Sequence, residues 1–217
     1  YTAKNINVLE GLSAIRTRPG MYIGDVGEKG LHHCVFEVLD NSIDEAVAGY
    51  GKEIKLTLSK GKIIVEDKGR GIPVDKKENG ISAATIVLTV LHAGGKFDKD
   101  SYKTSGGLHG IGIKATNATS KYLKLTIYKD GFIYEQEFEK GVPLYELKQK
   151  GITKKTGTTI EFIPDDTIFD SVEYKKEIII ERMRNSAFLT KGVKLIYKDD
   201  TEELEFFSEN GLKDMLI

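Results

Sequence analysis

Acidic and amide side chains recur at helical spacing in one stretch of the sequence. Glu37, Asn41 and Glu45 lie four residues apart, and His33 precedes them by one more turn. A carboxylate can act as a general base toward water. An amide oxygen is a good ligand for Mg²⁺, which usually keeps several waters and bridges substrate phosphates. Two interpretations stay open here, a solvated helix face or the base and metal ligand of a nucleotide site.

A second candidate group lies in IVEDKGRGIP, residues 64–73. A run of β-forming residues ends in Asp67, followed by a hinge with Gly69 and Gly71. A turn explains the glycines, because glycine adopts backbone conformations that other residues avoid. It does not explain why a strand delivers one carboxylate to the hinge, or why Pro73 stiffens the chain again. The local chemistry is therefore compatible with an acid placed for a specific contact.

A polar segment at 94–110 contains five glycines and three lysines. Glycines can turn successive backbone N–H groups toward an anion, and a predicted helix begins near Gly110, whose amino end favours phosphate. The alternative is a surface loop with solvated lysines, although structureless connections of this length are uncommon unless they are functional or disordered.

Two familiar phosphate-binding motifs do not account for this segment. The P-loop requires a Lys directly after its last glycine, and GGLHGIGIKAT has none there. The Rossmann pattern matches at Gly110, Gly112 and Ala115, with Asp130 at the distance expected for its acid. That fingerprint requires a buried strand before the first glycine, but the polar DSYKTSGGLH precedes it, so the match is weak.

Periodicity and turn signals predict the elements that position these groups. Helices are expected over 30–48, 81–91 (ending at Gly94–Gly95), 110–118 and about 171–187. In the first of them Val35, Val38, Leu39, Ser42, Ile43 and Ala46 share one side, and Glu37, Asn41, Asp44, Glu45 and Ala48 the opposite side. Strands are expected over 53–59, 62–67, 122–129, 132–138 and 158–163, and in a last hairpin of VKLIYKD and EELEFF. Without strict βαβ alternation, this order predicts an α+β two-layer sandwich, a mixed, mostly antiparallel sheet with helices on one face.

Length, net charge and cysteine content limit the classes of protein to which this sequence can belong. The 217 residues allow one large domain or at most two small ones. A net charge of −1 gives no argument for direct binding of DNA or an anionic membrane. The single Cys34 fits a reducing cytoplasm, and no stretch is apolar enough to span a membrane. Because the sequence begins at Tyr1, we expect a trimmed chain whose macromolecular contacts lie elsewhere.

Longer stretches resemble the ATPase domain of the GHKL superfamily, shared by type II topoisomerases, MutL, heat-shock chaperones and sensor histidine kinases. They are RPGMYIGD at 18–25, GLHHCVFEVLDNSIDEAVAG at 30–49, GRGIPV at 69–74, VLHAGGKFD at 90–98, SGGLHGIG at 105–112 and KTGTTIEF at 155–162. The match is closest to the B-subunit family of bacterial DNA gyrase and covers essentially the whole chain. It implies a single Bergerat-type ATPase domain over 1–217, with an N-terminal dimerisation arm and first helix at 1–15 and an ATP lid at 94–112.

The resemblance also implies roles for individual residues. Glu37 resembles the general base that activates the attacking water, with His33 beside it, and Asn41 resembles the ligand of a Mg²⁺ ion on the ATP phosphates. Asp67 resembles the acid that accepts a hydrogen bond from the adenine amino group. Thr158 resembles its helper on a neighbouring strand, through a shared water.

The remaining site residues follow from the same resemblance. The adenine and ribose wall and mouth would include Arg70, Gly71, Ile72 and Pro73, with Glu45 and Ile86 also in the nucleotide site. The lid would contain Gly94, Gly95, Lys96, Tyr102 and Lys103. Phosphate-binding backbone would come from Gly107, Leu108, His109, Gly110, Ile111 and Gly112. Tyr1 and Ile6 resemble the arm that reaches into the partner's nucleotide site.

Three positions depart from the family pattern. Lys68 stands where a second acid is usual, and we expect little effect on adenine, since neighbours on a strand point to opposite faces. Lys129 replaces an Arg near the pocket, which puts binding of coumarin-type inhibitors in doubt more than binding of ATP. The stretch KATNATS at 114–120 is also unusual after the lid.

For the whole protein, the resemblance implies an ATP-dependent type IIA topoisomerase. ATP would close a clamp between two copies of the subunit, and hydrolysis would reset it during negative supercoiling. The gyrase A subunit and DNA would be bound through domains missing here: the transducer, TOPRIM and C-terminal parts. Since a transducer lysine contacts the γ-phosphate in the family, this fragment is expected to bind ATP with weak or no turnover.

Three alternative functions are also considered. The matching subunit of topoisomerase IV, which decatenates or relaxes DNA, has the same ATPase domain. A nucleotide-gated dimerisation switch without turnover is a binding-module alternative, against which Glu37 argues. A histidine kinase is disfavoured, because the lid resembles that of a topoisomerase and no phospho-acceptor helix domain is present.

Overall fold

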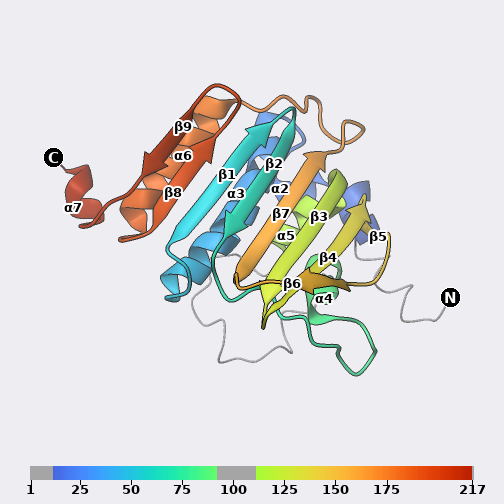
Figure 1. Ribbon diagram of the computed structural model, residues 1–217. Helices are drawn as coiled ribbons and strands as arrows, with labels where there is room; N and C mark the ends of the chain where they lie inside the picture. The colour runs from blue at the N-terminus through green and yellow to red at the C-terminus, as the bar shows by residue number, and fades with distance from the viewer. Residues whose placement is uncertain (1–11, 92–110, 217) are drawn as a thin grey trace.

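A single β-sheet organises the chain in the computed structural model, which describes residues 12–91 and 111–216. Its strand order is β5-β4-β3-β7-β2-β1-β8-β9, with β6 paired to β4 at one edge (Figure 1). Among the described strands β1 and β8 run parallel, and the other pairs are antiparallel. The strands are β1 (Glu53–Ser59), β2 (Lys62–Asp67), β3 (Ser120–Lys129), β4 (Phe132–Glu139), β5 (Val142–Pro143), β6 (Lys148–Ile152), β7 (Gly157–Pro164), β8 (Lys194–Lys198) and β9 (Glu203–Phe206). The predicted mixed, mostly antiparallel sheet is therefore confirmed.

The larger helices cover one face of this sheet, behind the strands in Figure 1. Residues 12–17 are also helical and precede α2. The helices are α2 (Gly20–Ile23), α3 (Glu28–Val47), α4 (Ala83–Thr89), α5 (Gly112–Ala118), α6 (Lys176–Leu189) and α7 (Leu212–Met215). None of the helices in the described ranges combines the length and the apolarity needed to cross a membrane.

The main core lies between α3 and the central strands. On α3 the predicted apolar side is buried, and β1 and β2 bury every second residue at Ile54, Leu56, Ile63 and Val65. Each fully buried aliphatic side chain contributes about 1.5–3 kcal/mol relative to exposure. This packing fixes the rotation of α3, so its opposite, polar side is left at the surface of the helical layer.

Most predicted elements are present, and the differences have local causes. The predicted helix at about 171–187 begins only at Lys176, because the Lys175 N–H donates instead to His32 Nε2 at 3.0 Å. Helix α4 is shorter than predicted at both ends: the Ser82 side chain caps its start by accepting from the Thr85 N–H, and the backbone becomes extended at Val90. Its predicted stop at Gly94–Gly95 lies outside the described residues. Strand β5 and the short helices α2 and α7 were not predicted, because they are too short for a periodic signal, and β6 was not predicted because its sequence KQKGI lacks alternating apolar residues.

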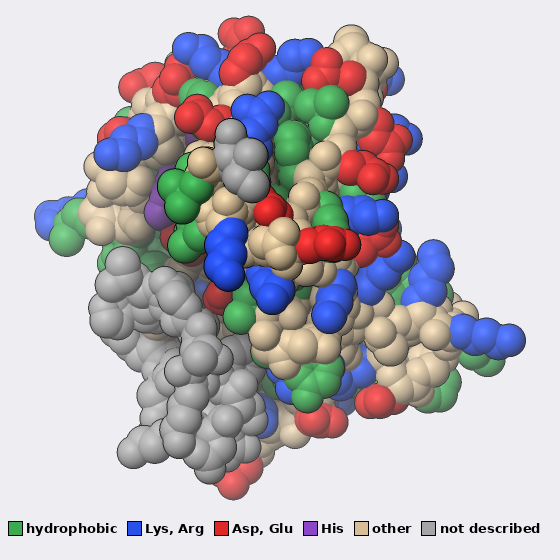
Figure 2. Space-filling model, turned by 90° about the vertical axis from the view of Figure 1, so that its left-hand side faces the viewer, with side chains coloured by type: hydrophobic (Ala, Val, Ile, Leu, Met, Phe, Trp, Pro, Cys, Tyr) green, Lys and Arg blue, Asp and Glu red, His purple; other side chains and the backbone are tan. Residues whose placement is uncertain are grey.

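Charged side chains of both signs lie interspersed over the face seen in Figure 2, which is the left-hand side of Figure 1. This mixture matches the net charge of −1. On the sheet, Lys62 pairs with Glu161 at 2.5 Å, and Lys124 lies 3.8 Å from Glu135. These side chains are only partly buried, and ion pairs that remain open to solvent contribute little to stability, about 0–1 kcal/mol each.

Candidate nucleotide site

A pocket lies between α3 and strands β2 and β7. Its lining comes from three parts of the chain that are far apart in sequence: the second half of α3, where the buried and polar sides meet, the end of β2 with the glycine hinge after it, and the start of β7. The lining residues are Val38, Asn41, Ser42, Asp44, Glu45, Val65, Asp67, Gly71, Ile72, Thr158 and Ile160. Aliphatic side chains alternate with a few convergent polar groups, which is typical of a small-molecule site.

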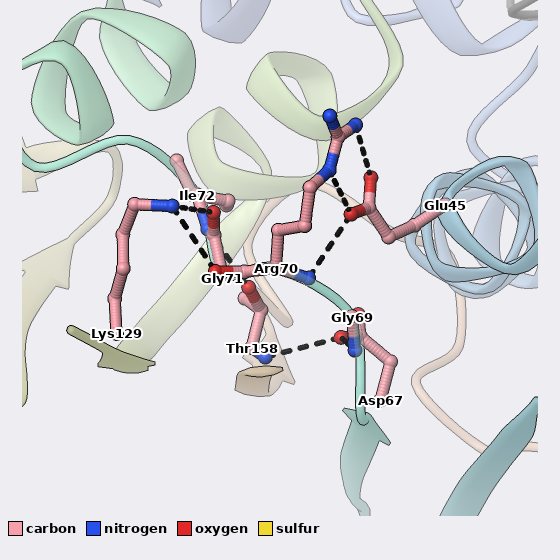
Figure 3. A network of polar contacts seen from close by, with 8 residues as sticks. All are labelled: Glu45, Asp67, Gly69, Arg70, Gly71, Ile72, Lys129 and Thr158. Atoms are coloured by element: carbon pink, nitrogen blue, oxygen red, sulfur yellow. Dashed lines mark hydrogen bonds and ion pairs between the residues drawn. The ribbon is translucent and has the colours of Figure 1, made fainter. Parts of the chain in front are cut away.

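Asp67 accepts three hydrogen bonds in the pocket, and Figure 3 shows it beside Gly69 and Thr158. Its Oδ1 accepts from the Gly69 N–H at 3.0 Å and from the Thr158 N–H at 3.1 Å, and its Oδ2 accepts from Ser42 Oγ at 2.8 Å. Burial raises the pKa of Asp67 above its ordinary value, although the three donors oppose that shift. The carboxylate is therefore locked in one orientation and is partly desolvated.

The backbone around Asp67 has no space for larger residues. Gly71 has φ +82°, which L side chains rarely adopt, and a Cβ there would lie 3.0 Å from the Tyr128 carbonyl oxygen. At Gly157, at the start of β7, a Cβ would lie 2.1 Å from the Asp67 carbonyl oxygen. Gly157 was missed as a functional position, although it lies within the KTGTTIEF stretch. These glycines let the hinge and β7 close around the acid.

The hinge is tied to both neighbouring strands. The Ile72 N–H donates to Thr158 Oγ1 at 3.2 Å, and Thr158 lies on β7 beside β2, where the resemblance placed the helper residue. Lys129 Nζ on β3 donates to the carbonyl oxygens of Arg70 at 3.1 Å and Gly71 at 3.4 Å (Figure 3). Lys129 therefore fixes the hinge backbone through its single ammonium group.

Arg70 and Glu45 bind each other next to the pocket. Arg70 Nε and Nη2 donate to the two Glu45 oxygens at 2.8 and 3.2 Å, and the Arg70 N–H donates to Oε1 at 3.0 Å. Burial alone would raise the pKa of Glu45, but the hydrogen bonds and charge of Arg70 outweigh burial and lower that pKa. The Arg70 guanidinium also lies 4.0 Å from the centre of the Tyr50 ring. Both residues were predicted in the nucleotide site; of the two, Glu45 lines the pocket within the described residues, and their contacts fix α3 to the hinge.

Glu37 lies farther along α3 with His33 as its partner. His33 Nε2 is 3.0 Å from Glu37 Oε1. The amino end of α5 approaches the same carboxylate so closely that a Cβ at Gly112 would lie 1.8 Å from Glu37 Oε2. The predicted base and the predicted phosphate-binding backbone at Gly112 are therefore in direct proximity.

Replacing Gly112 by alanine is expected to push the Glu37 carboxylate out of place, because the added methyl group would overlap it. Misplacing a reacting group by about 1 Å can cost on the order of 10²-fold in rate. We expect ATP turnover of the full-length protein to fall by about tenfold or more. Phosphate release, measured beside Gly20→Ala, whose added Cβ meets nothing within 4 Å, checks this. Equal rates for both variants would contradict the close approach.

The His33–Glu37 pair predicts a pH-dependent contribution to stability. The hydrogen bond to Glu37 raises the pKa of His33 above its ordinary 6.5, against the opposing effect of burial. Since the folded-state pKa is the higher one, the stabilisation is fully present below pH 6.5 and is lost as pH rises through the folded-state value. Both side chains are partly exposed, so it amounts to less than about 1 kcal/mol.

The measurement is the free energy of unfolding of the wild type and of His33→Asn at about pH 5.5 and about pH 8.5. We expect the variant to be less stable than the wild type mainly at the lower pH. If the wild type and the variant differed in free energy of unfolding by the same amount at both pH values, the raised pKa of His33 would not come from Glu37.

Two further polar residues of the pocket were not singled out by sequence reasoning. Ser42 looked like one more residue on the buried side of α3, yet its hydroxyl holds Asp67. Asp44 lines the pocket, and burial, with the charges of Asp40 and Glu37, raises its pKa to about 6. The i, i+3 and i+7 spacing of Glu37, Asp40 and Asp44 was the available signal. Asp40 itself accepts from Arg182 Nη2 of α6 at 2.8 Å.

The other predicted residues are placed as follows. Asn41 is exposed on α3 and lines the pocket, Pro73 follows the hinge, and Ile111 directly precedes α5. Ile86 is buried in α4 and is not among the residues that line the pocket in the described ranges. Lys68 binds Glu53 rather than facing the pocket, as its position after Asp67 on the strand led us to expect. Outside the described residues lie Tyr1, Ile6, Gly94, Gly95, Lys96, Tyr102, Lys103, Gly107, Leu108, His109 and Gly110.

A family model and individual relatives both match this chain, and both point to the same kind of ATPase. The family described as histidine kinase-, DNA gyrase B- and HSP90-like ATPases matches residues 27–168. The B subunit of DNA gyrase from Helicobacter pylori is 51% identical over 220 residues, which is 98% of this chain and 28% of that protein. The B subunit of DNA gyrase from Thermotoga maritima is 52% identical over 216 residues, 98% of this chain and 34% of that protein.

A topoisomerase IV subunit is similar at nearly the same level. The B subunit of DNA topoisomerase 4 from Enterococcus faecalis is 49% identical over 223 residues, 100% of this chain and 33% of that protein. The chain therefore spans about a third or less of the length of these relatives.

Proposed function

Because this chain belongs to the family of histidine kinase-, DNA gyrase B- and HSP90-like ATPases, we propose that its pocket binds and hydrolyses ATP. The observation that carries the proposal is the locked Asp67 carboxylate in a pocket of aliphatic side chains. One carboxylate oxygen accepts from the adenine amino group. The hinge backbone at Gly71 and Ile72 lies against the base, and Thr158 fixes that backbone.

Hydrolysis is proposed to occur where Glu37 meets the start of α5. Glu37 accepts a proton from the attacking water, and its hydrogen bond with His33 orients the carboxylate. The backbone around Gly112 contributes N–H groups toward the phosphates. The Glu45–Arg70 pair keeps α3, which carries Glu37, in register with the hinge that carries the adenine contact.

Asn41 is the proposed protein ligand of Mg²⁺. Its side chain is exposed at the pocket and offers an amide oxygen, which suits a hard cation. Within the described residues no group of three or more His, Cys, Asp or Glu is arranged to hold a metal. Asn41 would therefore share the ion with phosphate oxygens and water, and the ion would supply charge neutralisation at the phosphates.

The nucleotide assignment is tested by calorimetric titration with ATP and GTP in the presence of Mg²⁺. Guanine carries a carbonyl oxygen where adenine carries its amino group, so it places an acceptor against the Asp67 carboxylate. We expect ATP to bind at least about tenfold more tightly, since an unmatched buried polar pair costs about 1–3 kcal/mol. Equal affinities would contradict the adenine contact.

For the whole protein, we propose the B subunit of DNA gyrase, a cytoplasmic type IIA topoisomerase that acts with an A subunit on DNA. Residues 1–217 would form its ATPase domain, and the arm would join two subunits when ATP is bound. The relatives from Helicobacter pylori and Thermotoga maritima, both gyrase B subunits, favour this assignment over topoisomerase IV. Without a lysine from a following domain, the isolated domain is proposed to bind ATP with weak turnover.

Reconstitution separates the two topoisomerase functions. The full-length protein is combined with a gyrase A subunit or with the corresponding topoisomerase IV subunit and is given relaxed and catenated DNA with ATP. We expect ATP-dependent negative supercoiling with the gyrase partner. Decatenation with the other partner, and no supercoiling with the first, would establish the topoisomerase IV alternative.

A further inference from the structure

The carboxyl end of α5 is held by two groups from distant parts of the chain. Arg16 Nη1 donates to the Ala118 carbonyl oxygen at 2.9 Å, and the Asp165 N–H donates to the Thr119 carbonyl oxygen at 3.0 Å. Arg16 Nη2 binds Asp165 Oδ2 at 2.8 Å, and the Asp165 side chain is only 1% exposed. The last carbonyl groups of a helix have no partner within it, and these contacts supply partners for two of them at the end of α5.

The same helix meets the proposed general base at its other end. Gly112 begins α5, with no room for a side chain between it and Glu37. One turn further on, Thr116 Oγ1 donates to the Cys34 carbonyl oxygen at 3.0 Å, and Cys34 precedes Glu37 by one turn on α3. Seven residues of α-helix span about 10 Å. Helix α5 thus contacts Arg16 at its carboxyl end and Glu37 at its amino end.

The helical residues 12–17 also pack along α5. Leu12 and Ile15 belong to a buried cluster that includes Ala115 and Ala118 of α5. Arg16 directly follows Ile15 in sequence and adds the hydrogen bonds at the end of α5. A close-packed contact of this kind transmits a displacement rather than absorbing it.

We propose that Arg16 is a positioning residue for the ATPase reaction, which acts through α5 to hold Gly112 against Glu37. The proposal rests on the hydrolytic role of Glu37 proposed above. Arg16 touches neither the nucleotide pocket nor Glu37, so its effect is on the orientation of the base. The adenine contacts at Asp67 and Thr158 lie on β2 and β7 and are independent of it.

The test compares Arg16→Met with Arg16→Lys in the full-length protein. Methionine removes both hydrogen bonds, whereas lysine keeps the charge but cannot bind Ala118 and Asp165 with a fork of two nitrogens. Arg184→Met is the matched control, because Arg184 is exposed on α6 and its guanidinium lies over Phe206. We expect Arg16→Met to lower turnover per bound ATP by about tenfold or more. ATP affinity should stay within about twofold, and Arg16→Lys should be intermediate.

A second measurement separates positioning from general destabilisation. The pKa of His33, followed by NMR of labelled histidine, depends on its hydrogen bond to Glu37. In Arg16→Met we expect this pKa to move toward its ordinary value, and in Arg184→Met to stay at the wild-type value. A structural defect alone would lower the amount of folded protein without changing the His33 pKa of the folded fraction.

The outcomes distinguish this proposal from the proposed function. If the wild type hydrolyses ATP and Arg16→Met retains both its turnover per bound ATP and its His33 pKa, the positioning role is overturned and the ATPase proposal stands. If the wild type binds ATP without hydrolysis, the proposed reaction fails. In that case a shifted His33 pKa in Arg16→Met still supports the contact through α5, and an unshifted one overturns it.

Discussion

Replacing Glu37 by alanine in the full-length protein is expected to abolish measurable ATP turnover while leaving ATP binding intact. A positioned general base contributes on the order of 10²–10⁴-fold to rate. Glu37 is not among the residues proposed to contact adenine, which are Asp67, Thr158 and the hinge backbone that they hold together. Steady-state phosphate release and calorimetric titration with ATP measure the two properties separately.

Two further variants test whether the loss of turnover is due to the missing carboxylate of Glu37. Glu37→Gln keeps the size of the side chain next to Gly112 but cannot accept the proton, so it should be as inactive as the alanine variant. Glu181→Ala, which removes an exposed acid from α6, is the matched control and should turn over normally. Normal turnover in Glu37→Gln would remove Glu37 from the role of base. It would then favour a nucleotide switch in which this residue does not act on water.

Replacing Asp67 by asparagine is expected to lower ATP affinity by about tenfold to over a hundredfold. The asparagine carbonyl can take the place of Oδ1 and accept from the Gly69 and Thr158 N–H groups. Its amide nitrogen then replaces Oδ2, and the Ser42 hydroxyl can accept instead of donating. The local structure is kept, but an N–H donor now faces the adenine amino group.

Calorimetric titration gives the affinity, and thermal unfolding shows whether the fold is kept. Lys68→Met is the matched control, because the neighbouring Lys68 binds Glu53 away from the pocket. It should bind ATP like the wild type. An Asp67→Asn protein that is folded and binds ATP with wild-type affinity would place the adenine elsewhere.

Local patterns in the sequence were enough to predict most elements and the candidate chemistry. The strands over 53–59 and 62–67 were predicted with the bounds that the structure has, because alternation and a turn signal are local properties. The buried and polar sides of α3 followed from its period in the same way. The stretch that ends in Asp67 indicated an acid at a hinge, and the resemblance supplied its proposed partner, adenine.

The groups that hold these candidates in place became visible only in the folded chain. Ser42 donates to Asp67 across 25 residues of sequence, Thr158 across 91, and Arg16 reaches Asp165 across 149. No period or motif within one segment specifies such pairs, because they depend on how the sheet and the helices pack. The approach of Gly112 to Glu37 is of the same kind. Local patterns in the sequence indicated which residues can bind or react with a ligand. Packing between distant segments determined the orientation of their side chains, because the contacts that hold them come from elsewhere in the chain.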